Sequence, residues 1–443
     1  MSALARYYNH AGCKVAGYDR TVSKLTEELE KEGISIHYED DLSLIPKEFF
    51  DQKDKTLVIY TPAVPKEMRE LVYFSQNGYN LVKRSKALGV IASGKVCLAV
   101  AGTHGKTTTS TLLAHIMTSS GAGCTAFLGG ISKNYNNNLL LSNSRYLVAE
   151  ADEFDRSFLQ LFPDTAVITS TDADHLDIYE NPDHFREAFT TFASQIKNNG
   201  FLVLKEGVNI DITGTSAKIY RYSFDKVSHF YASEIVIGGD GIITFTLNYP
   251  QGRIEGCTLV IPGWVNVENA IAASAVALLN GVSPIKLKEA LATFRGVERR
   301  FDIKVNTPKC SYIDDYAHHP QEIKAAISSM RNIFPGRRLT GIFQPHLFTR
   351  TRDFAAEFAE SLSALDELIL LDIYPARELP IEGVTSKIIF DKVRIDNKIQ
   401  VTKDELMPLL ESREIDALIS FGAGDIDRFV KPITDLLNRK LGL

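Results

Sequence analysis

Residues 96–117 read VCLAVAGTHGKTTTSTLLAHIM, and this stretch decides the fold at the centre of the chain. The apolar run 96–101 meets a glycine-containing turn at 102–107, and apolar residues at helical spacing follow. Strand, glycine loop and helix in this order form a phosphate cradle, because N–H groups of the loop and the helix start surround phosphate oxygens. The general pattern GxxxxGK[ST] lacks its first glycine, since Val100 stands there, but GTHGKT is intact.

The residue types in this loop match the needs of a bound nucleotide. Lys106 supplies a positive charge near the terminal phosphates, and the Thr107 hydroxyl is a ligand for Mg²⁺. An ordinary strand–helix turn that happens to contain a lysine is the alternative interpretation, and the GKT triplet directly after a strand disfavours it. The residues expected to bind nucleotide here are Gly102, Thr103, His104, Gly105, Lys106, Thr107 and Thr108.

Composition bounds the class of protein. The chain has 443 residues, 44% of them hydrophobic and 23% charged, which is enough for two to four domains with buried cores. Its formal net charge of −6 gives no sign of a basic face for nucleic acid. No run approaches 18 apolar residues, and MSALARYYNHAG at the start lacks the apolar core of a signal peptide. Five scattered cysteines fit reduced thiols, so we expect a cytoplasmic protein without a membrane or nucleic-acid partner.

The order of predicted elements gives the fold class. Three regions follow one another, residues 1–93, 94–297 and 298–443, and each alternates apolar strands with helical periodicity. Such alternation predicts an α/β protein with mostly parallel sheets covered by helices. The clearest strands outside the centre lie in TLVIY (56–60), CSYIDDY (310–316), RLTGIF (338–343) and DALISF (416–421). Most of them run into polar residues, and ligands bind at the carboxyl ends of strands in such sheets.

Two acidic segments follow strands next to the loop in the sequence. The strand 146–149 leads into EADEFD, which begins at Glu150, and the strand 166–169 leads into TDADH, which ends at His175. A nucleoside triphosphate site needs hard oxygen ligands for Mg²⁺. By itself EADEFD is more typical of a solvated acidic turn, but its place beside a phosphate loop favours a site built on Glu150 and His175.

Seven segments in order resemble the Mur ligases, ATP-dependent amide-forming enzymes of peptidoglycan synthesis. They are AGTHGKTTT, AEADEFDRSFL, TSTDADHLDIY, RRFD, DDYAHHPQE, FQPHLFTRTRDF and LDIYPARELPIEGVTS. The resemblance spans nearly the whole chain and points to the alanine-adding branch. It implies an N-terminal Rossmann-like domain that binds a UDP-sugar, a central P-loop ATPase domain and a C-terminal Rossmann-like domain, here 1–93, 94–297 and 298–443.

The resemblance also implies a reaction and its participants. ATP, with Mg²⁺, phosphorylates the carboxylate of UDP-N-acetylmuramate, and the amine of L-alanine attacks the acyl phosphate to form an amide, ADP and phosphate. Phosphorylation makes chemical sense, because a free carboxylate is a poor acylating agent. We expect a monomer or a weak homodimer.

The resemblance assigns roles residue by residue. The metal ligands are Thr107, Glu150 and His175. The contacts to nucleotide, beyond the loop, are Asn266, Asn269, Arg299, Arg300 and Asp314. The catalytic and acceptor-binding residues are Lys106, His175, His318, His346 and Arg350, and Arg350 is the choice for holding a carboxylate. Simpler interpretations stay open: a solvated pair at Arg299–Arg300, a turn shaped by His318–His319 before a proline, and an Arg350 and Arg352 that face solvent at the start of a helix.

The sequence departs from the family pattern in three places. Family members open with a strand and a turn of the form GxGGxGM, whereas residues 1–6 read as the following helix already under way. We therefore expect the first domain to lack a strand and its anion-binding loop. Val265 stands where many members have histidine, and Leu347 where many have arginine.

Three other functions compete with an alanine-adding ligase. A murein tripeptide recycling ligase shares the UDP-sugar and adds a preformed peptide. A catalytically impaired nucleotide-binding homologue is the hypothesis that the missing N-terminal loop motivates. A plain ATPase or GTPase switch is disfavoured by the substrate-like residues of the third region. GAGD at 422–425 follows a strand, and we interpret it as a packing turn rather than a second phosphate loop.

Overall fold

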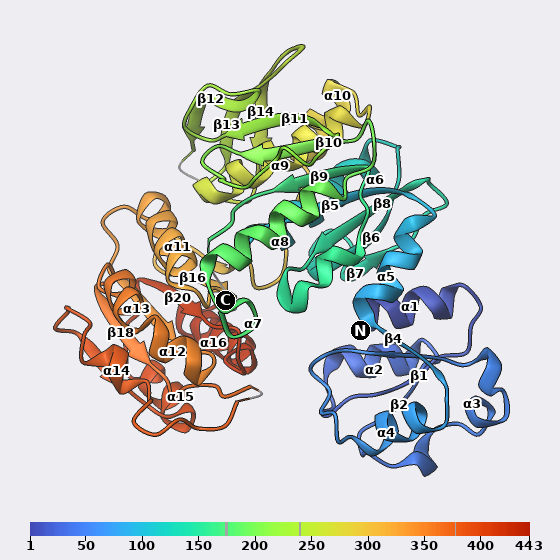
Figure 1. Cartoon of the computed structure of the whole chain (residues 1–443). Helices are drawn as coiled ribbons and strands as arrows, with labels where there is room; N and C mark the ends of the chain where they lie inside the picture. Colours follow the sequence, from blue (N-terminus) through green and yellow to red (C-terminus); the bar gives the residue numbers. More distant parts are fainter. Residues whose placement is uncertain (173–175, 239–240, 377) are drawn as a thin grey trace. The chain divides into compact units, whose positions relative to one another are not determined.

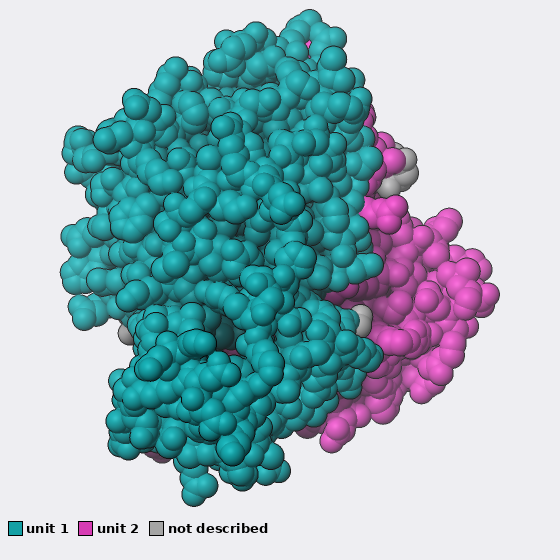
Figure 2. All heavy atoms as spheres, turned by 90° about the vertical axis from the view of Figure 1, so that its right-hand side faces the viewer, with its two compact units in different colours: residues 1–233, 246–257, 269–294 teal, residues 234–245, 258–268, 295–443 magenta. Residues whose placement is uncertain are grey.

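The computed structural model describes residues 1–172, 176–238, 241–376 and 378–443. It divides into two compact units, coloured separately in Figure 2, and we describe each by itself. The first comprises residues 1–233, 246–257 and 269–294, and the second comprises residues 234–245, 258–268 and 295–443. Helices and strands alternate along the chain in both (Figure 1), which confirms the α/β prediction. None of the helices in the described ranges is long and apolar enough to cross a membrane.

The first 93 residues form two small parallel sheets with helices beside them. Strand β1 pairs with β2, and β3 pairs with β4. The chain enters helix α1 at its second residue, as the sequence predicts. The helices and strands are α1 (Ser2–His10), β1 (Ala16–Tyr18), α2 (Lys24–Lys31), β2 (Ser35–His37), α3 (Glu48–Asp51), β3 (Leu57–Tyr60), α4 (Arg69–Gln76), β4 (Asn80–Lys83) and α5 (Arg84–Ser93).

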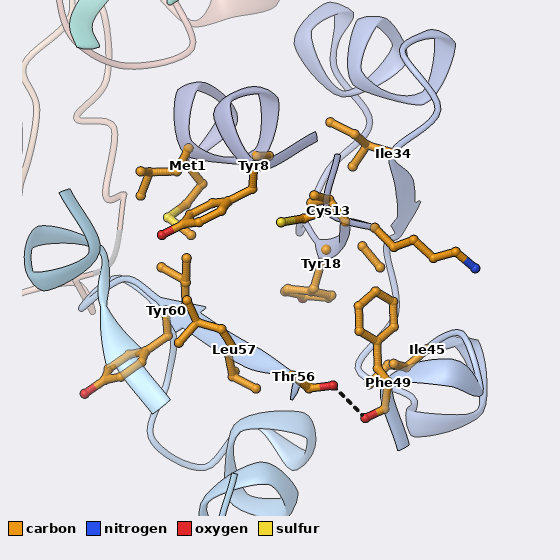
Figure 3. Close-up of a pocket in the computed structure, with 18 of the residues that line it drawn as sticks. Met1, Tyr8, Cys13, Tyr18, Ile34, Ile45, Phe49, Thr56, Leu57 and Tyr60 are labelled. Atoms are coloured by element: carbon orange, nitrogen blue, oxygen red, sulfur yellow. Dashed lines mark hydrogen bonds between the residues drawn. The ribbon is translucent and has the colours of Figure 1, made fainter. Parts of the chain in front are cut away.

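A cavity of about 800 Å³ is lined by both small sheets and by α1. Figure 3 shows Tyr8 of α1, Tyr18 of β1 and Leu57 of β3 around it. Its walls are mostly apolar, and a buried pair, His37 Nε2 and Glu70 Oε1 at 2.7 Å, is among the lining residues. In the described part of the chain β1 and β3 each have one partner strand. Each therefore keeps one edge with backbone groups that a further strand could pair.

The centre of the chain forms a ten-stranded sheet in the order β14-β13-β12-β11-β10-β9-β5-β8-β6-β7. Its helices and strands are β5 (Val96–Ala101), α6 (Lys106–Ser119), β6 (Thr125–Ser132), β7 (Asn137–Leu140), β8 (Tyr146–Ala151), β9 (Thr165–Ile168), α7 (Leu176–Tyr179), α8 (Pro182–Ser194), β10 (Phe201–Lys205), β11 (Lys218–Ser223), β12 (Phe230–Ile237), β13 (Ile243–Tyr249), β14 (Gly252–Leu259), α9 (Trp264–Leu279) and α10 (Pro284–Leu291).

Strand β5 is the key element of this sheet. It lies between β9 and β8 and runs parallel to both, so the carboxyl ends of the three strands meet at one edge. Residues 97–101 are fully buried, as expected for a strand covered on both faces. The pairing of β6 with β7 is antiparallel, an exception to the parallel arrangement.

The second unit contains a six-stranded sheet in the order β15-β16-β20-β17-β18-β19. Only the pairing of β15 with β16 is antiparallel among its described pairs. Its helices and strands are β15 (Asp302–Asn306), β16 (Ser311–Asp315), α11 (Pro320–Ile333), β17 (Leu339–Phe343), α12 (Phe348–Asp353), α13 (Ala355–Leu362), β18 (Glu367–Leu370), α14 (Lys387–Phe390), β19 (Lys398–Gln400), α15 (Lys403–Glu411), β20 (Ala417–Phe421) and α16 (Asp427–Leu441). Parallel pairing brings the polar residues after β16, β20 and β17 to one edge.

Candidate active site

The loop between β5 and α6 has the shape that a phosphate cradle requires. Gly102 and Gly105 have φ values of +132° and +79°, where side chains are strained. A Cβ atom on Gly102 would lie 2.1 Å from Thr169 Oγ1, and one on Gly105 would lie 2.6 Å from Asn269 Oδ1. The Thr169 hydroxyl donates to the carbonyls of Ala101 and His104, which fixes the loop against the end of β9. Both glycines are therefore needed where they stand.

Lys106 is the first residue of α6, and its ammonium turns back onto its own loop. Nζ donates to the carbonyls of Gly102 at 2.7 Å and Thr103 at 3.1 Å. It also lies 2.8 Å from both carboxylate oxygens of Glu153, a side chain that is only 2% exposed. The structure thus places Lys106 at the glycine loop between β5 and α6, as expected, and adds a carboxylate partner that the sequence did not single out.

Glu150 and Thr107 meet at the same edge. The Thr107 hydroxyl donates to Glu150 Oε1 at 3.2 Å, and the amide of Gly129 donates to Oε2 at 3.2 Å. A hydroxyl and a carboxylate beside a phosphate cradle are the hard oxygen donors that Mg²⁺ prefers, with substrate phosphates and water completing its shell. The residues therefore fit a magnesium ion held by Thr107 and Glu150. The third expected ligand, His175, lies outside the described residues.

The four acids of EADEFD have four different partners. Asp152 lies 3.3 Å from Arg84 Nη2, and Asp155 lies 2.9 Å from Lys83 Nζ. These two acids thus bind the junction of β4 and α5. Glu150 and Glu153 remain at the loop, each beside one of its functional side chains. No feature of the sequence distinguishes Glu153 from its acidic neighbours, because its partner is decided by tertiary packing.

The charges around Lys106 favour protonation of both members of its ion pair. Burial raises the pKa of Glu153 to about 7, against the lowering effect of Lys106. Burial by itself would lower the pKa of Lys106, but the carboxylates of Glu153, Asp152 and Glu150 raise it overall. The Lys106 ammonium lies near the carboxylates of Glu150, Asp152 and Glu153 in a poorly hydrated place. The excess of negative charge therefore stabilises the protonated forms of both Lys106 and Glu153.

The remaining residues of the cradle are held by protein contacts. The Thr103 hydroxyl donates to the carbonyl of Asp172, and the His104 amide donates to Ser170 Oγ. Thr108 is buried. Asn269, expected near the adenine, accepts a hydrogen bond from Thr109 Oγ1 at 3.1 Å. Asn266, described with the second unit, donates to the carbonyl of Pro262 at 2.6 Å.

In the second unit, the paired arginines surround a buried aspartate and a tyrosine. Arg299 Nε donates to Asp314 Oδ2 at 3.1 Å, and its Nη2 donates to the Gly422 carbonyl at 2.7 Å. The guanidinium groups of Arg299 and Arg300 lie 5.3 and 4.8 Å from the ring centroid of Tyr316. Arg299 is thus integrated into the fold rather than exposed in a linker. Burial raises the pKa of the fully buried Asp314, and Arg299 opposes this effect.

The two histidines before Pro320 have different roles in the structure. His319 caps α11, because its Nδ1 accepts the Gln321 amide at 3.4 Å and its own amide donates to Glu322. His318 Nδ1 contacts the Tyr316 carbonyl at 3.0 Å, and its ring lies 6.2 Å from the ring of His346. The structure therefore brings His318 and His346 together, and the turn-shaping alternative describes His319.

The segment after β17 positions Arg350. Leu347 precedes α12 with a φ of +72°, a strained value for leucine, and its amide donates to the Tyr374 carbonyl. Arg350 is 7% exposed, whereas Arg352 is exposed and pairs with Asp353. The solvent-facing interpretation is therefore wrong for Arg350 and correct for Arg352.

The GAGD segment is a packing turn, as expected. A Cβ atom on Gly424 would lie 2.5 Å from Gln344 Oε1, and one on Gly422 would lie 2.9 Å from the Gln344 carbonyl. Asp425 accepts from Gln344 Nε2 at 2.8 Å and pairs with Lys403. The glycines thus allow the end of β20 to pack against the end of β17.

Comparison with known proteins gives the family. Three family models match in succession: the Mur ligase family catalytic domain at residues 1–96, the Mur ligase middle domain at 100–277, and the glutamate ligase domain of Mur ligases at 299–424. The UDP-N-acetylmuramate–L-alanine ligase of Parabacteroides distasonis is 52% identical over 443 residues, which are 100% of this chain and 96% of that protein. The chain belongs to the Mur ligase family.

Other relatives and solved structures agree with this membership. A UDP-N-acetylmuramate–L-alanine ligase of Porphyromonas gingivalis is 52% identical and covers 99% of the chain and 96% of its own length. The crystal structure of the UDP-N-acetylmuramate–alanine ligase of Thermotoga maritima matches with a TM-score of 0.80 at 27% identity, covering 99% of this chain and 97% of that one. A murein peptide ligase of Psychrobacter arcticus shares the fold, with a TM-score of 0.71 at 22% identity over 99% and 96% of the two chains.

Proposed function

We propose that this Mur ligase uses ATP to join L-alanine to UDP-N-acetylmuramate, as the relatives with 45–52% identity are named to do. The observation that supports this most is the Lys106–Thr107–Glu150 constellation, found in a chain that aligns along its whole length with those relatives. A nucleotide cradle alone would serve many reactions. Its combination with the second unit's His318, His346 and buried Arg350 favours a ligase over a simple nucleotide hydrolase.

The chemistry follows from the residues in each unit. A carboxylate oxygen of UDP-N-acetylmuramate attacks the γ-phosphorus of ATP and ADP leaves, which gives an acyl phosphate. The amine of L-alanine then attacks the carbonyl carbon, the bond to phosphate breaks, and the amine loses a proton. Lys106 and the loop amides bind the phosphates of ATP and stabilise the charge that develops on them.

Mg²⁺ held by Thr107 and Glu150 would reduce the repulsion between the phosphates and the attacking carboxylate. Arg350 is proposed to hold a substrate carboxylate, because a planar guanidinium binds two oxygens at once. His318 and His346 are proposed to orient the acceptor amine. Exclusion of bulk water would protect an acyl phosphate from hydrolysis, and we therefore expect the site to close during the reaction.

A product assay tests the function and its acceptor. The protein is incubated with ATP, Mg²⁺ and UDP-N-acetylmuramate together with either L-alanine or the tripeptide L-alanyl-γ-D-glutamyl-meso-diaminopimelate. The mass of the UDP-linked product is then determined by mass spectrometry. We expect the alanine adduct from the first mixture and none from the second. The tripeptide adduct alone would identify a recycling ligase instead, and no adduct with either acceptor from the folded protein would refute ligase activity.

A further inference from the structure

Acceptors in the protein itself take up every N–H donor of the Lys106 ammonium. A lysine ammonium has three N–H donors. Among the described residues, the carbonyls of Gly102 and Thr103 and the carboxylate of Glu153 lie within 2.7–3.1 Å of Nζ and account for all three. A phosphate that binds Lys106 must therefore replace one of these acceptors.

Glu153 is the acceptor whose interaction changes most when a phosphate arrives. The carbonyls of Gly102 and Thr103 are neutral and belong to the loop itself, which Thr169 holds in place. The carboxylate of Glu153 carries the same sign of charge as a phosphate, and both anions need the same ammonium. At this degree of burial the repulsion between them is weakly screened.

The carboxylate of Glu153 is confined to this position. Its side chain is 2% exposed, and its backbone carbonyl accepts the Tyr179 hydroxyl at 2.6 Å and the Arg156 amide at 3.0 Å. The next turn is unusual, since Asp155 and Arg156 have φ values of +52° and +54°. Such left-handed conformations persist only where the surrounding structure holds them. Withdrawal of the carboxylate into solvent is thus opposed by the local fold.

We propose that Glu153 is a positioning residue that holds Lys106 on its loop in the nucleotide-free protein and competes with the terminal phosphate of the nucleotide for its ammonium. The inference rests on the nucleotide binding of the proposed function. Glu153 thereby lowers the affinity for ADP and ATP, keeps the lysine oriented between turnovers and favours release of ADP. AMP is unaffected, because the lysine of such a loop reaches the β- and γ-phosphates.

Nucleotide binding to Glu153→Gln tests the proposal. Affinities for ADP, ATP and AMP are measured by calorimetry without Mg²⁺, on the full chain and the variant. The pH is 8.5, at which Glu153, with its pKa raised to about 7, is ionised. We expect ADP and ATP to bind at least fivefold more tightly to Glu153→Gln and AMP to bind equally. Asp152→Asn is the matched control, since it removes the same charge one residue away from a side chain that pairs with Arg84 instead of Lys106. We expect less than a twofold change there.

A second variant and a stability measurement keep the result interpretable. Glu153→Asp retains the charge but withdraws the carboxylate from Lys106 by one methylene, and we expect an intermediate gain in ADP affinity. Thermal unfolding shows which variants are folded. Unchanged or weaker ADP binding by a folded Glu153→Gln or Glu153→Asp would overturn the competition. Absence of ADP binding to the unmodified chain would instead refute the proposed function at the cradle, and this inference with it.

Discussion

Replacement of Lys106 by alanine tests the cradle and its buried ion pair together. The change removes the ammonium that contacts Gly102, Thr103 and Glu153. Loss of one preorganised charge at a reacting phosphate typically lowers turnover about 100- to 1000-fold. The change also leaves a carboxylate that is 2% exposed without its counter-ion. Breaking a buried pair in this way costs about 3–5 kcal/mol when the remaining charge cannot be neutralised.

The pKa of Glu153 makes this cost depend on pH. Its rise from the usual 4.5 to about 7 means that the folded protein binds more protons at this group than the unfolded chain does. The stability of the unmodified protein therefore falls by about 3 kcal/mol from this group as pH rises from 4.5 to 7. In Lys106→Ala the lowering effect of the lysine is gone, so the pKa rises further and the loss continues above pH 7.

Urea unfolding of both proteins at pH 5.5 and pH 8 measures the effect on stability. A separate phosphate-release assay at pH 8 measures the effect on turnover. We expect the variant to release phosphate about 100- to 1000-fold more slowly than the parent, at low and at saturating ATP. We expect it to be nearly as stable as the parent at pH 5.5. At pH 8 it should be clearly less stable. Equal destabilisation at both pH values would contradict the ion pair, and phosphate release at the parental rate would contradict the role of Lys106 in binding phosphate.

Three further predictions follow from other contacts. Glu150→Gln should leave the fold intact but raise the Mg²⁺ concentration needed for half-maximal activity at least tenfold, and an unchanged Mg²⁺ titration would contradict its role as a metal ligand. Arg299→Met should lower the free energy of unfolding by about 3–5 kcal/mol in urea, because it leaves the buried Asp314 without its counter-ion. Arg300→Met removes a contact with the Tyr316 ring and a favourable charge near Asp315, which is partly exposed, and should cost less. An apolar strand of about six residues, joined ahead of Met1 by a short linker, should enter the cavity lined by β1 and β3. It should raise the free energy of unfolding by at least about 2 kcal/mol, which is what burial of one large apolar side chain contributes. The control is the same extension with charged residues at alternate positions, and equal unfolding midpoints for both extensions would exclude strand insertion.

The side-chain placements that the sequence predicted are those that local order determines. The loop from Gly102 to Thr107 joins a strand to a helix, so its shape follows from consecutive residues. Glu150 could be placed beside it because parallel strands end at the same edge of a sheet, and β8 is the neighbour of β5. The strand ends at Asp314 and His346 in the second unit were predictable for the same reason.

The parts that could not be predicted depend on residues far apart in the sequence. Asp152 pairs with Arg84 and Glu153 with Lys106, 68 and 47 positions away, and nothing in EADEFD itself assigns these partners. The role of His319 as a helix cap required the structure, because a histidine before proline is equally compatible with a catalytic role. The integration of Arg299 into the fold depends on Asp314 and on the Gly422 carbonyl, 123 positions away.

Transfer of labelled oxygen tests most directly whether the cradle activates a carboxylate. UDP-N-acetylmuramate with both oxygens of its lactyl carboxylate replaced by ¹⁸O is incubated with the protein, ATP, Mg²⁺ and L-alanine, and the released phosphate is analysed by mass spectrometry. We expect one ¹⁸O atom in each phosphate released, with one amide formed and no release when the UDP-sugar is omitted. Phosphate without ¹⁸O would mean that the γ-phosphate is transferred to water, and it would contradict the assignment of this protein as an amide-forming ligase.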